Sequence, residues 1–198
     1  MNRLAVFMIG FALSGGLSCA FPRAPQDEAA LPPVSAAAEP GKDAAAVDEV
    51  EALLARHLTG LARFEVRRAA EALIAESRRN RIDPALVLAV MHTESGYYNF
   101  ARSSVGALGL MQIMPATGEM LVREQGLEWT GPDMLFDPEL NLRLGTRYLA
   151  FLYARYGSWP EALAAYNWGP GAIDKKLAEG ESLPVQYTNR VYARLARQ

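Results

Sequence analysis

The sequence predicts a mainly α-helical protein, and three observations lead to this prediction. Beyond residue 47, apolar residues recur every three to four positions, as they do along one face of a helix. Asp-Pro pairs precede two of these stretches, and glycines follow them. No stretch sustains the alternation of apolar and polar residues that a half-buried strand requires. With 198 residues, 51% of them apolar, the chain can build one domain with a core but not two.

Two amphipathic helices are expected on either side of Gly60. The apolar face of the first, which starts at Val47, consists of Val50, Leu53, Leu54 and Leu58. The apolar face of the second consists of Leu61, Val66, Ala69, Leu73 and Ile74. Both faces keep helical spacing, so the domain is expected to begin with a helical pair.

The next two helices are marked by their ends. Asp83 can cap a helix over residues 84–94, whose first position is a proline that needs no backbone N–H donor. A further helix is predicted over residues 116–125, where Gly126 stops it.

Three more helices are expected in the C-terminal half. Asp137 caps a long helix that begins at Pro138 and ends at Gly157. Another helix starts at residues 159–160, and residues 185–196 form the last one.

Residues 1–20 have the three parts of a secretory signal peptide. Arg3 supplies the positive charge, residues 4–17 form the apolar stretch, and small residues follow. The apolar stretch is too short to span a bilayer comfortably as a permanent helix. The sequence therefore predicts an exported protein of the periplasm or cell envelope.

Cys19 is the one cysteine of the chain, so no intrachain disulfide can form. The run Leu17-Ser18-Cys19 resembles the lipobox at which bacterial lipoproteins are cleaved and acylated, although Gly16 stands where leucine is commonest. Acylation of Cys19 would hold the protein firmly to a membrane, here expected to be the outer membrane. The alternative is ordinary signal cleavage after Ala20.

Residues 21–46 are rich in alanine and proline and contain almost no large apolar side chains. Such a segment cannot bury enough apolar surface to fold, so it is expected to be a disordered tether. If Cys19 is acylated, this tether lets the domain reach the cell wall from the membrane surface.

Charge and composition argue against several classes of function. The formal net charge of −2 does not favour binding to nucleic acid. The histidines His57 and His92 have no cysteine partners and do not make a zinc site, and no cofactor is expected. Three arginines near the C-terminus, Arg190, Arg194 and Arg197, are expected to be solvated helix surface. Contact with anionic peptide stems or lipid head groups is a less favoured alternative.

Glu94 is the strongest candidate for a catalytic residue. In the predicted helix it shares a face with Val87, Val90 and Met91, so the carboxyl group points where the apolar residues point. Desolvation and the negative end of the helix dipole both favour its protonated form. A neutral carboxylic acid near pH 7 is the proton donor that glycosidic bond cleavage requires. The alternative is an ordinary surface glutamate at a fraying helix end.

Several segments around and beyond Glu94 occur in a recognisable order. They are DPALVLAV at residues 83–90, the Glu94-Ser95 pair, GLMQIMPAT at 109–117, Phe136-Asp137-Pro138 with Asn141, Gly145, Tyr148 and Leu149, and AAYNWGPG at 164–171. Together, from about Leu73 to Val191, they resemble the soluble lytic transglycosylase family, which cleaves the glycan strands of bacterial peptidoglycan. Two departures exist: Asn99 stands where the family often has proline, and Leu183-Pro184 replace a usual Glu-Thr pair.

The resemblance implies a lysozyme-like helical domain over residues 47–198, with an N-terminal helical extension. It implies that Glu94 is the only catalytic carboxylate, first as acid and then as base. In the family, the 6-hydroxyl of N-acetylmuramic acid attacks in place of water, which leaves a 1,6-anhydro end. No second acid lies in a matching segment near the site; Glu119, Asp133 and Asp137 are expected to be helix caps or surface residues.

The resemblance also marks residues expected to bind the sugar. Ser103 matches a serine beside the acid, with a purely structural turn hydroxyl as an equal alternative. Gln112 can offer a donor and an acceptor to a sugar amide, and Met111 is expected to line the groove.

Three residues further along complete this set of expectations. The Tyr166 hydroxyl can reach Glu94 or the anomeric region, and Asn167 is expected to hold the backbone of the turn. Tyr187 falls on a family tyrosine at the cleft. Among the aromatic residues near matched positions, at least half are expected in the core and the rest in glycan subsites: Tyr97, Tyr98, Phe100 and Trp168.

The leading hypothesis is a peptidoglycan lytic transglycosylase that cleaves the β-1,4 bond between N-acetylmuramic acid and N-acetylglucosamine. A goose-type lysozyme, which adds water, is the alternative within enzymes. A non-catalytic peptidoglycan-binding scaffold is the third hypothesis, although such a protein gains nothing from a desolvated acid.

Overall fold

The computed structural model describes residues 40–197, and within them the protein is almost entirely helical. The predicted signal peptide, Cys19 and most of the predicted tether lie outside the described residues. In the described range no β-sheet forms, and the extended pairing is limited to isolated bridges of Leu108 with Arg102 and Ile113. The mainly α-helical class predicted from the sequence is confirmed.

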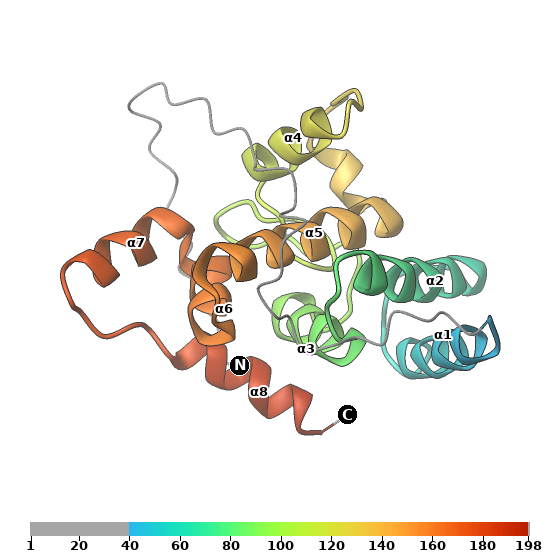
Figure 1. Cartoon of the computed structure of the whole chain (residues 1–198). Helices are drawn as coiled ribbons and strands as arrows, with labels where there is room; N and C mark the ends of the chain where they lie inside the picture. Colours follow the sequence, from blue (N-terminus) through green and yellow to red (C-terminus); the bar gives the residue numbers. More distant parts are fainter. Residues whose placement is uncertain (1–39, 198) are drawn as a thin grey trace.

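Most helices follow one another with short connections, whereas residues 96–114 form a long loop between α3 and α4 (Figure 1). Their bounds are α1 Pro40–Leu54, α2 Arg63–Arg79, α3 Pro84–Ser95, α4 Pro115–Glu124, the 3₁₀ helix η1 Pro132–Phe136, α5 Pro138–Tyr156, α6 Trp159–Trp168, α7 Pro170–Ala178 and α8 Gln186–Leu195. All seven helices predicted from the sequence are present, and most of their ends lie within two residues of the predicted ones.

Helix α1 begins at Pro40, seven residues before the predicted start, so the expected boundary of the tether at residue 46 is wrong. The reason is local: Asp43 lies in the first turn, where a carboxylate favours the helix dipole, and alanine, the strongest helix former, follows at residues 44–46. Asp43 also forms an ion pair with Arg78 of α2.

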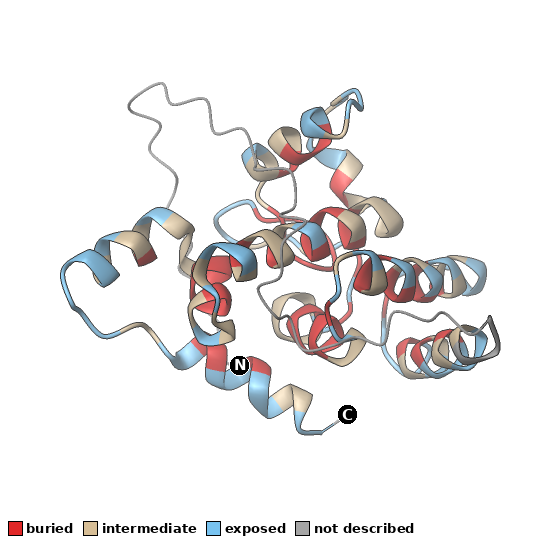
Figure 2. Ribbon diagram, viewed as in Figure 1, coloured by how far each residue is buried: buried red, intermediate tan, exposed pale blue. Residues whose placement is uncertain are grey.

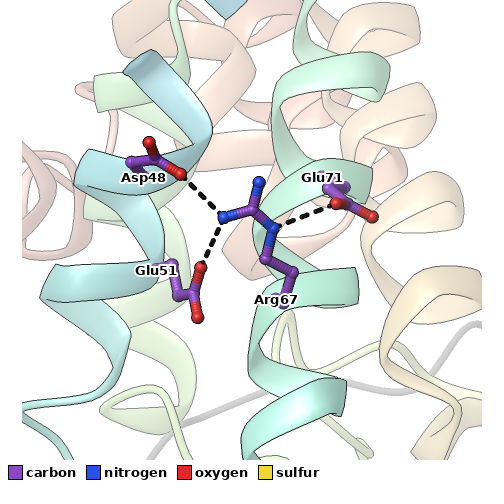
Figure 3. A network of polar contacts seen from close by, with 4 residues as sticks. All are labelled: Asp48, Glu51, Arg67 and Glu71. Atoms are coloured by element: carbon purple, nitrogen blue, oxygen red, sulfur yellow. Dashed lines mark hydrogen bonds and ion pairs between the residues drawn. The ribbon is translucent and has the colours of Figure 1, made fainter. Parts of the chain in front are cut away.

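An arginine holds α1 against α2 (Figure 3). The Nη1 atom of Arg67 lies 2.7 Å from Asp48 Oδ1 and 2.9 Å from Glu51 Oε2, both on α1. Its Nε atom lies 3.2 Å from Glu71 Oε1, one turn further along α2. The helical extension is therefore tied to the domain by charge as well as by the buried side chains of Val47, Val50 and Leu54.

The middle of helix α3 lies in the core, and Figure 2 shows it in red. Every residue from Leu86 to Met91 is buried. Helix α3 packs against α2 and α8, while α5 lies against α2 and α6. The end of α3 therefore emerges from the core between elements that are distant in sequence.

Two helices were not expected from the sequence, η1 and α7. In α7 only Ile173 is buried, so no apolar periodicity reveals the helix. Its start, with Gly169 at φ 81° before Pro170, also has the composition of a turn. In residues 40–197 no helix has the length and apolar character needed to cross a membrane.

Candidate active site

Glu94 lies in the last turn of α3, as the sequence predicts. The helix starts where Asp83 Oδ1 accepts a hydrogen bond from the Ala85 N–H at 2.9 Å, and it ends at Gly96, which adopts the left-handed conformation at φ 60°. Ser95 ties the end down, because its hydroxyl donates to the Met91 carbonyl and accepts from the Tyr97 N–H. The acid is thus fixed at the exit of a rigid helix.

The carboxyl group of Glu94 is half-buried and has one close partner. The Tyr187 hydroxyl donates a hydrogen bond to Glu94 Oε1 at 2.5 Å. Burial raises the pKa of Glu94 to about 7, although the Tyr187 hydrogen bond and the charge of Arg190 both lower it. Desolvation dominates, so a large fraction of Glu94 is protonated at neutral pH.

Tyr187 is itself buried and is supplied by α8, the last helix of the domain. Thr188 helps to seat this helix, since its hydroxyl lies 3.4 Å from the Pro160 carbonyl at the start of α6. Tyr187 therefore lies beside Glu94 although Leu183 and Pro184 replace the usual pair upstream, and its role in binding the sugar stays a prediction.

Tyr166 makes a different hydrogen bond from the expected one. Its hydroxyl donates to the Met111 carbonyl at 2.9 Å rather than to Glu94. The residue is buried, and both this burial and the nearby charge of Glu94 raise its pKa well above the ordinary value. Tyr166 thus lies beside the acid but holds the loop that carries Met111.

That loop, residues 101–114, is fixed by Asn141 of α5. The side-chain oxygen of Asn141 accepts from the Met111 N–H at 2.8 Å, and its amide donates to the Leu108 and Leu135 carbonyls. Gly109, at φ 80°, makes this possible: a Cβ there would lie 2.3 Å from both Asn141 Nδ2 and the Leu135 carbonyl oxygen. The sequence predicted no role for Asn141, because a buried amide that joins this loop to η1 leaves no local signal.

Gln112 and Ser103 serve the same loop. Gln112 adopts φ 50°, and its amide donates to the Ala101 and Gly109 carbonyls at 3.1 and 2.9 Å. Its donor is therefore used inside the protein. Ser103 Oγ accepts from the Ala107 N–H at 2.9 Å, which is the turn role that was weighed as its alternative.

Met111 does not line a groove, so this expectation is wrong. Its side chain is fully buried against Gly145, where an added Cβ would lie 2.4 Å from the Met111 sulfur. The close approach of α5 to the loop requires a glycine at residue 145, and the methionine fills that space.

Asn167 lies in α6 next to Tyr166 and is 7% exposed. Within the described part of the chain its side chain makes no hydrogen bond, contrary to the expected role of holding the turn. Of the four aromatic residues, Tyr97 is buried and Trp168 packs partly buried against the core, whereas Tyr98 and Phe100 are exposed.

The three other carboxylates considered all have structural roles. Glu119 pairs with Arg123 at 2.8 Å, and Asp133 pairs with Arg102 at 3.2 Å. Asp137 caps α5 by accepting from the Leu140 N–H at 2.7 Å. Among the described residues, no group of three or more histidine, cysteine, aspartate or glutamate side chains is placed to hold a metal ion.

Comparison with known proteins agrees with this geometry. Residues 71–188 match the family model of the transglycosylase SLT domain. The chain is 38% identical over 99 residues to a soluble lytic murein transglycosylase of Salmonella typhimurium, covering 49% of this chain and 15% of that protein. It is 35% identical over 125 residues to membrane-bound lytic murein transglycosylase C of Salmonella paratyphi B, covering 58% and 35%.

A solved structure gives the same result. An inactive glutamate-to-glutamine mutant of lytic transglycosylase Slt from Pseudomonas aeruginosa superposes with a TM-score of 0.55 and 29% identity, over 63% of this chain and 22% of that one. The regions matched in all three relatives are a minor part of those longer proteins. The lysozyme-like helical fold implied by the resemblance is confirmed, and, since the family model matches more than half of its length, the chain belongs to the SLT transglycosylase family.

Proposed function

We propose that this protein is a peptidoglycan lytic transglycosylase. It cleaves the β-1,4 bond between N-acetylmuramic acid and N-acetylglucosamine and leaves a 1,6-anhydromuramic acid end. The observation that carries the proposal is a single half-buried carboxyl group, Glu94, whose pKa is raised to about 7 by burial, while no other carboxylate of residues 40–197 acts on that pKa. Ordinary glycoside hydrolases need two carboxylates that flank the bond.

In the proposed reaction, protonated Glu94 donates its proton to the glycosidic oxygen as the bond to the anomeric carbon breaks. The resulting carboxylate is stabilised by the Tyr187 hydroxyl and by the charge of Arg190. Glu94 then accepts the proton of the sugar's own 6-hydroxyl as that oxygen bonds to the anomeric carbon. The acid returns to its starting state, and no water is consumed.

The polar groups around Glu94 support sugar binding to different degrees. Asn167 has an amide that makes no hydrogen bond to any described residue, so it can bind the acetamido group. Gln112 retains its side-chain oxygen as an acceptor, since only its amide nitrogen is used by the loop. Ser103 contributes by shaping the turn, and Tyr166 by holding the loop beside the acid.

The product of digestion tests the proposal. With intact glycan strands, mass spectrometry of the released muropeptides is expected to find 1,6-anhydro ends as the main product. Reducing ends, or oxygen from labelled water at the cleaved anomeric carbon, would identify a goose-type lysozyme activity instead. Binding to peptidoglycan without any release would leave the scaffold hypothesis.

We also propose that the protein is exported and anchored through Cys19 to the outer membrane. The support is the lone cysteine after the apolar stretch of the signal, together with a relative described as membrane-bound. The Cys19→Ala variant is expected to move from the membrane fraction to the soluble periplasm. A wild-type protein whose mature N-terminus is Phe21 would contradict the anchor and support cleavage after Ala20.

A further inference from the structure

Three arginines lie on helix α8 or just after its end, and the charge of the first acts on Glu94. Beyond Glu181 the sequence contains no acidic residue, whereas Arg190, Arg194 and Arg197 follow at helical spacing. None of the three forms an ion pair with a described residue. Other arginines of residues 40–197, such as Arg67 and Arg155, are paired with carboxylates, although Arg56, Arg63, Arg81 and Arg147 are not.

Arg190 is the arginine of this run that lies at the site. It follows Tyr187 by three residues, so the two side chains share a face of α8. The guanidinium carbon of Arg190 lies 5.6 Å from the centre of the Tyr187 ring, whose hydroxyl contacts Glu94. Arg190 is exposed, so its guanidinium is accessible to solvent beside the hydrogen-bonded pair.

The positive charge of Arg190 lowers the pKa of Glu94 and so opposes the effect of burial on that pKa. A positive charge nearby favours the carboxylate form, whereas proton donation needs the neutral form. The same charge stabilises the carboxylate that remains after proton donation. Since no described carboxylate pairs with the exposed Arg190 side chain beside the site, the structure points to an anionic group of the substrate as its partner.

We propose that Arg190 binds a carboxylate on the side chain of muramic acid and so determines specificity for muramic acid over uncharged glycans. This inference rests on the proposed function. The lactyl group of muramic acid ends in a carboxyl group, which is free in naked strands and is extended by a peptide with its own carboxylates in intact ones. A guanidinium fork matches either carboxylate with two parallel hydrogen bonds.

Kinetics on three substrates test the inference. They are peptide-bearing strands, strands stripped by an amidase so that the lactyl carboxylate is free, and stripped strands whose carboxylate is capped as a methylamide. The Arg190→Gln variant is expected to raise KM about tenfold on an anionic substrate, as the loss of a hydrogen bond to a charged group does, and to leave KM unchanged on the capped strands. The matched control is Arg194→Gln, which removes the same charge one turn further along α8.

The pattern across substrates identifies the carboxylate. A rise in KM on stripped strands alone indicates the lactyl group, and a rise on peptide-bearing strands alone indicates the peptide. Added salt is expected to raise the wild-type KM on the anionic substrate more than the KM of Arg190→Gln, because salt screens exposed charges.

Two results would overturn the inference. One is an equal rise in KM on the capped neutral strands, which would mean that Arg190 acts through Glu94 and not on a substrate carboxylate. The other is no rise in KM on any substrate. The proposed function is tested separately by the ends that wild-type enzyme produces in the same digestions. Reducing ends would contradict that function whatever the KM of the Arg190→Gln variant.

Discussion

At Glu94, two opposing effects act on one carboxyl group. Burial raises its pKa, while the Tyr187 hydroxyl and the Arg190 charge lower it, and the balance lies at about 7. A group with a pKa near the working pH can both donate and accept a proton at little cost. The proposed mechanism needs both steps from the same residue, and this balance suits it for both.

Replacement of Glu94 by glutamine tests its role directly. Glu94→Gln removes the transferable proton but keeps size and polarity, so the rate is expected to fall at least about a hundredfold while the fold survives. The rate is measured by release of muropeptides, and the fold by circular dichroism. Glu119→Gln, which changes a surface carboxylate paired with Arg123, is the control and is expected to keep full activity. Residual activity of Glu94→Gln within tenfold of wild type would assign the acid elsewhere.

The raised pKa of Glu94 also predicts how activity and stability change with pH. The rate is expected to fall as pH rises through about 7, because Glu94 loses its proton. The folded protein holds this proton between the ordinary pKa of 4.5 and about 7, whereas the unfolded chain does not. Glu94 therefore makes stability decrease across that window as pH rises.

The Tm of wild type relative to Glu94→Gln measures this linkage. The wild-type Tm is expected to drop relative to the variant between about pH 4.5 and 7 and to level off above it. Parallel Tm curves for the two proteins would show that Glu94 titrates normally in the fold.

Loss of the Tyr187 hydroxyl is expected to change the acid rather than the fold. Tyr187→Phe removes the hydrogen bond that stabilises the Glu94 carboxylate, so the pKa of Glu94 rises and the basic limb of the rate profile moves to higher pH. The maximal rate is expected to fall roughly tenfold, since a hydrogen bond to a charged group is lost. Tyr192→Phe, on an exposed face of the same helix, is the control. An unmoved pH profile would show that Tyr187 does not act on Glu94.

Among the elements, the loop over residues 101–114 depends most on single residues. Gly109→Ala is expected to destabilise the protein by at least about 2 kcal/mol, because it adds backbone strain and forces Asn141 from its hydrogen bonds. Urea unfolding measures the loss. Gly106→Ala is the matched control: it has a similar φ of 93°, but nothing lies within 4 Å of its added Cβ. Equal losses in the two variants would mean that strain alone accounts for the effect.

Local signals explain which elements the sequence predicted. The Asp-Pro starts of α3 and α5 and the glycines after them depend on neighbours in the chain, so they can be recognised without a structure. Helix α7 was missed because only one of its residues is buried. The early start of α1 was missed because an alanine-rich segment has the composition of a linker as well as of a helix.

At the scale of the whole molecule, the site combines positions that no local pattern connects. The face of Glu94 followed from helical spacing, but its contact with Tyr187 was not predicted, since the family resemblance placed Tyr187 only at the cleft. The hydrogen bond of Tyr166 to the Met111 carbonyl depends on how α6 packs against the loop. The bonds of Asn141 to backbone groups of that loop and of η1 depend on how α5 packs. Such hydrogen-bond partners are set by tertiary structure. A single sequence can therefore indicate which residues matter but not which of them bond to one another.

The hydrogen bond between Tyr187 and Glu94 joins positions 93 residues apart. A polypeptide is synthesised from its N-terminus, so Glu94 emerges long before α8, and contacts across such a separation require the intervening chain to close first. A truncated or half-emerged chain therefore has an acid without its hydroxyl partner. The protein is proposed to cut the wall that encloses its own cell. Because Tyr187 lies on the last helix, the site is complete only after α8 has packed against α3.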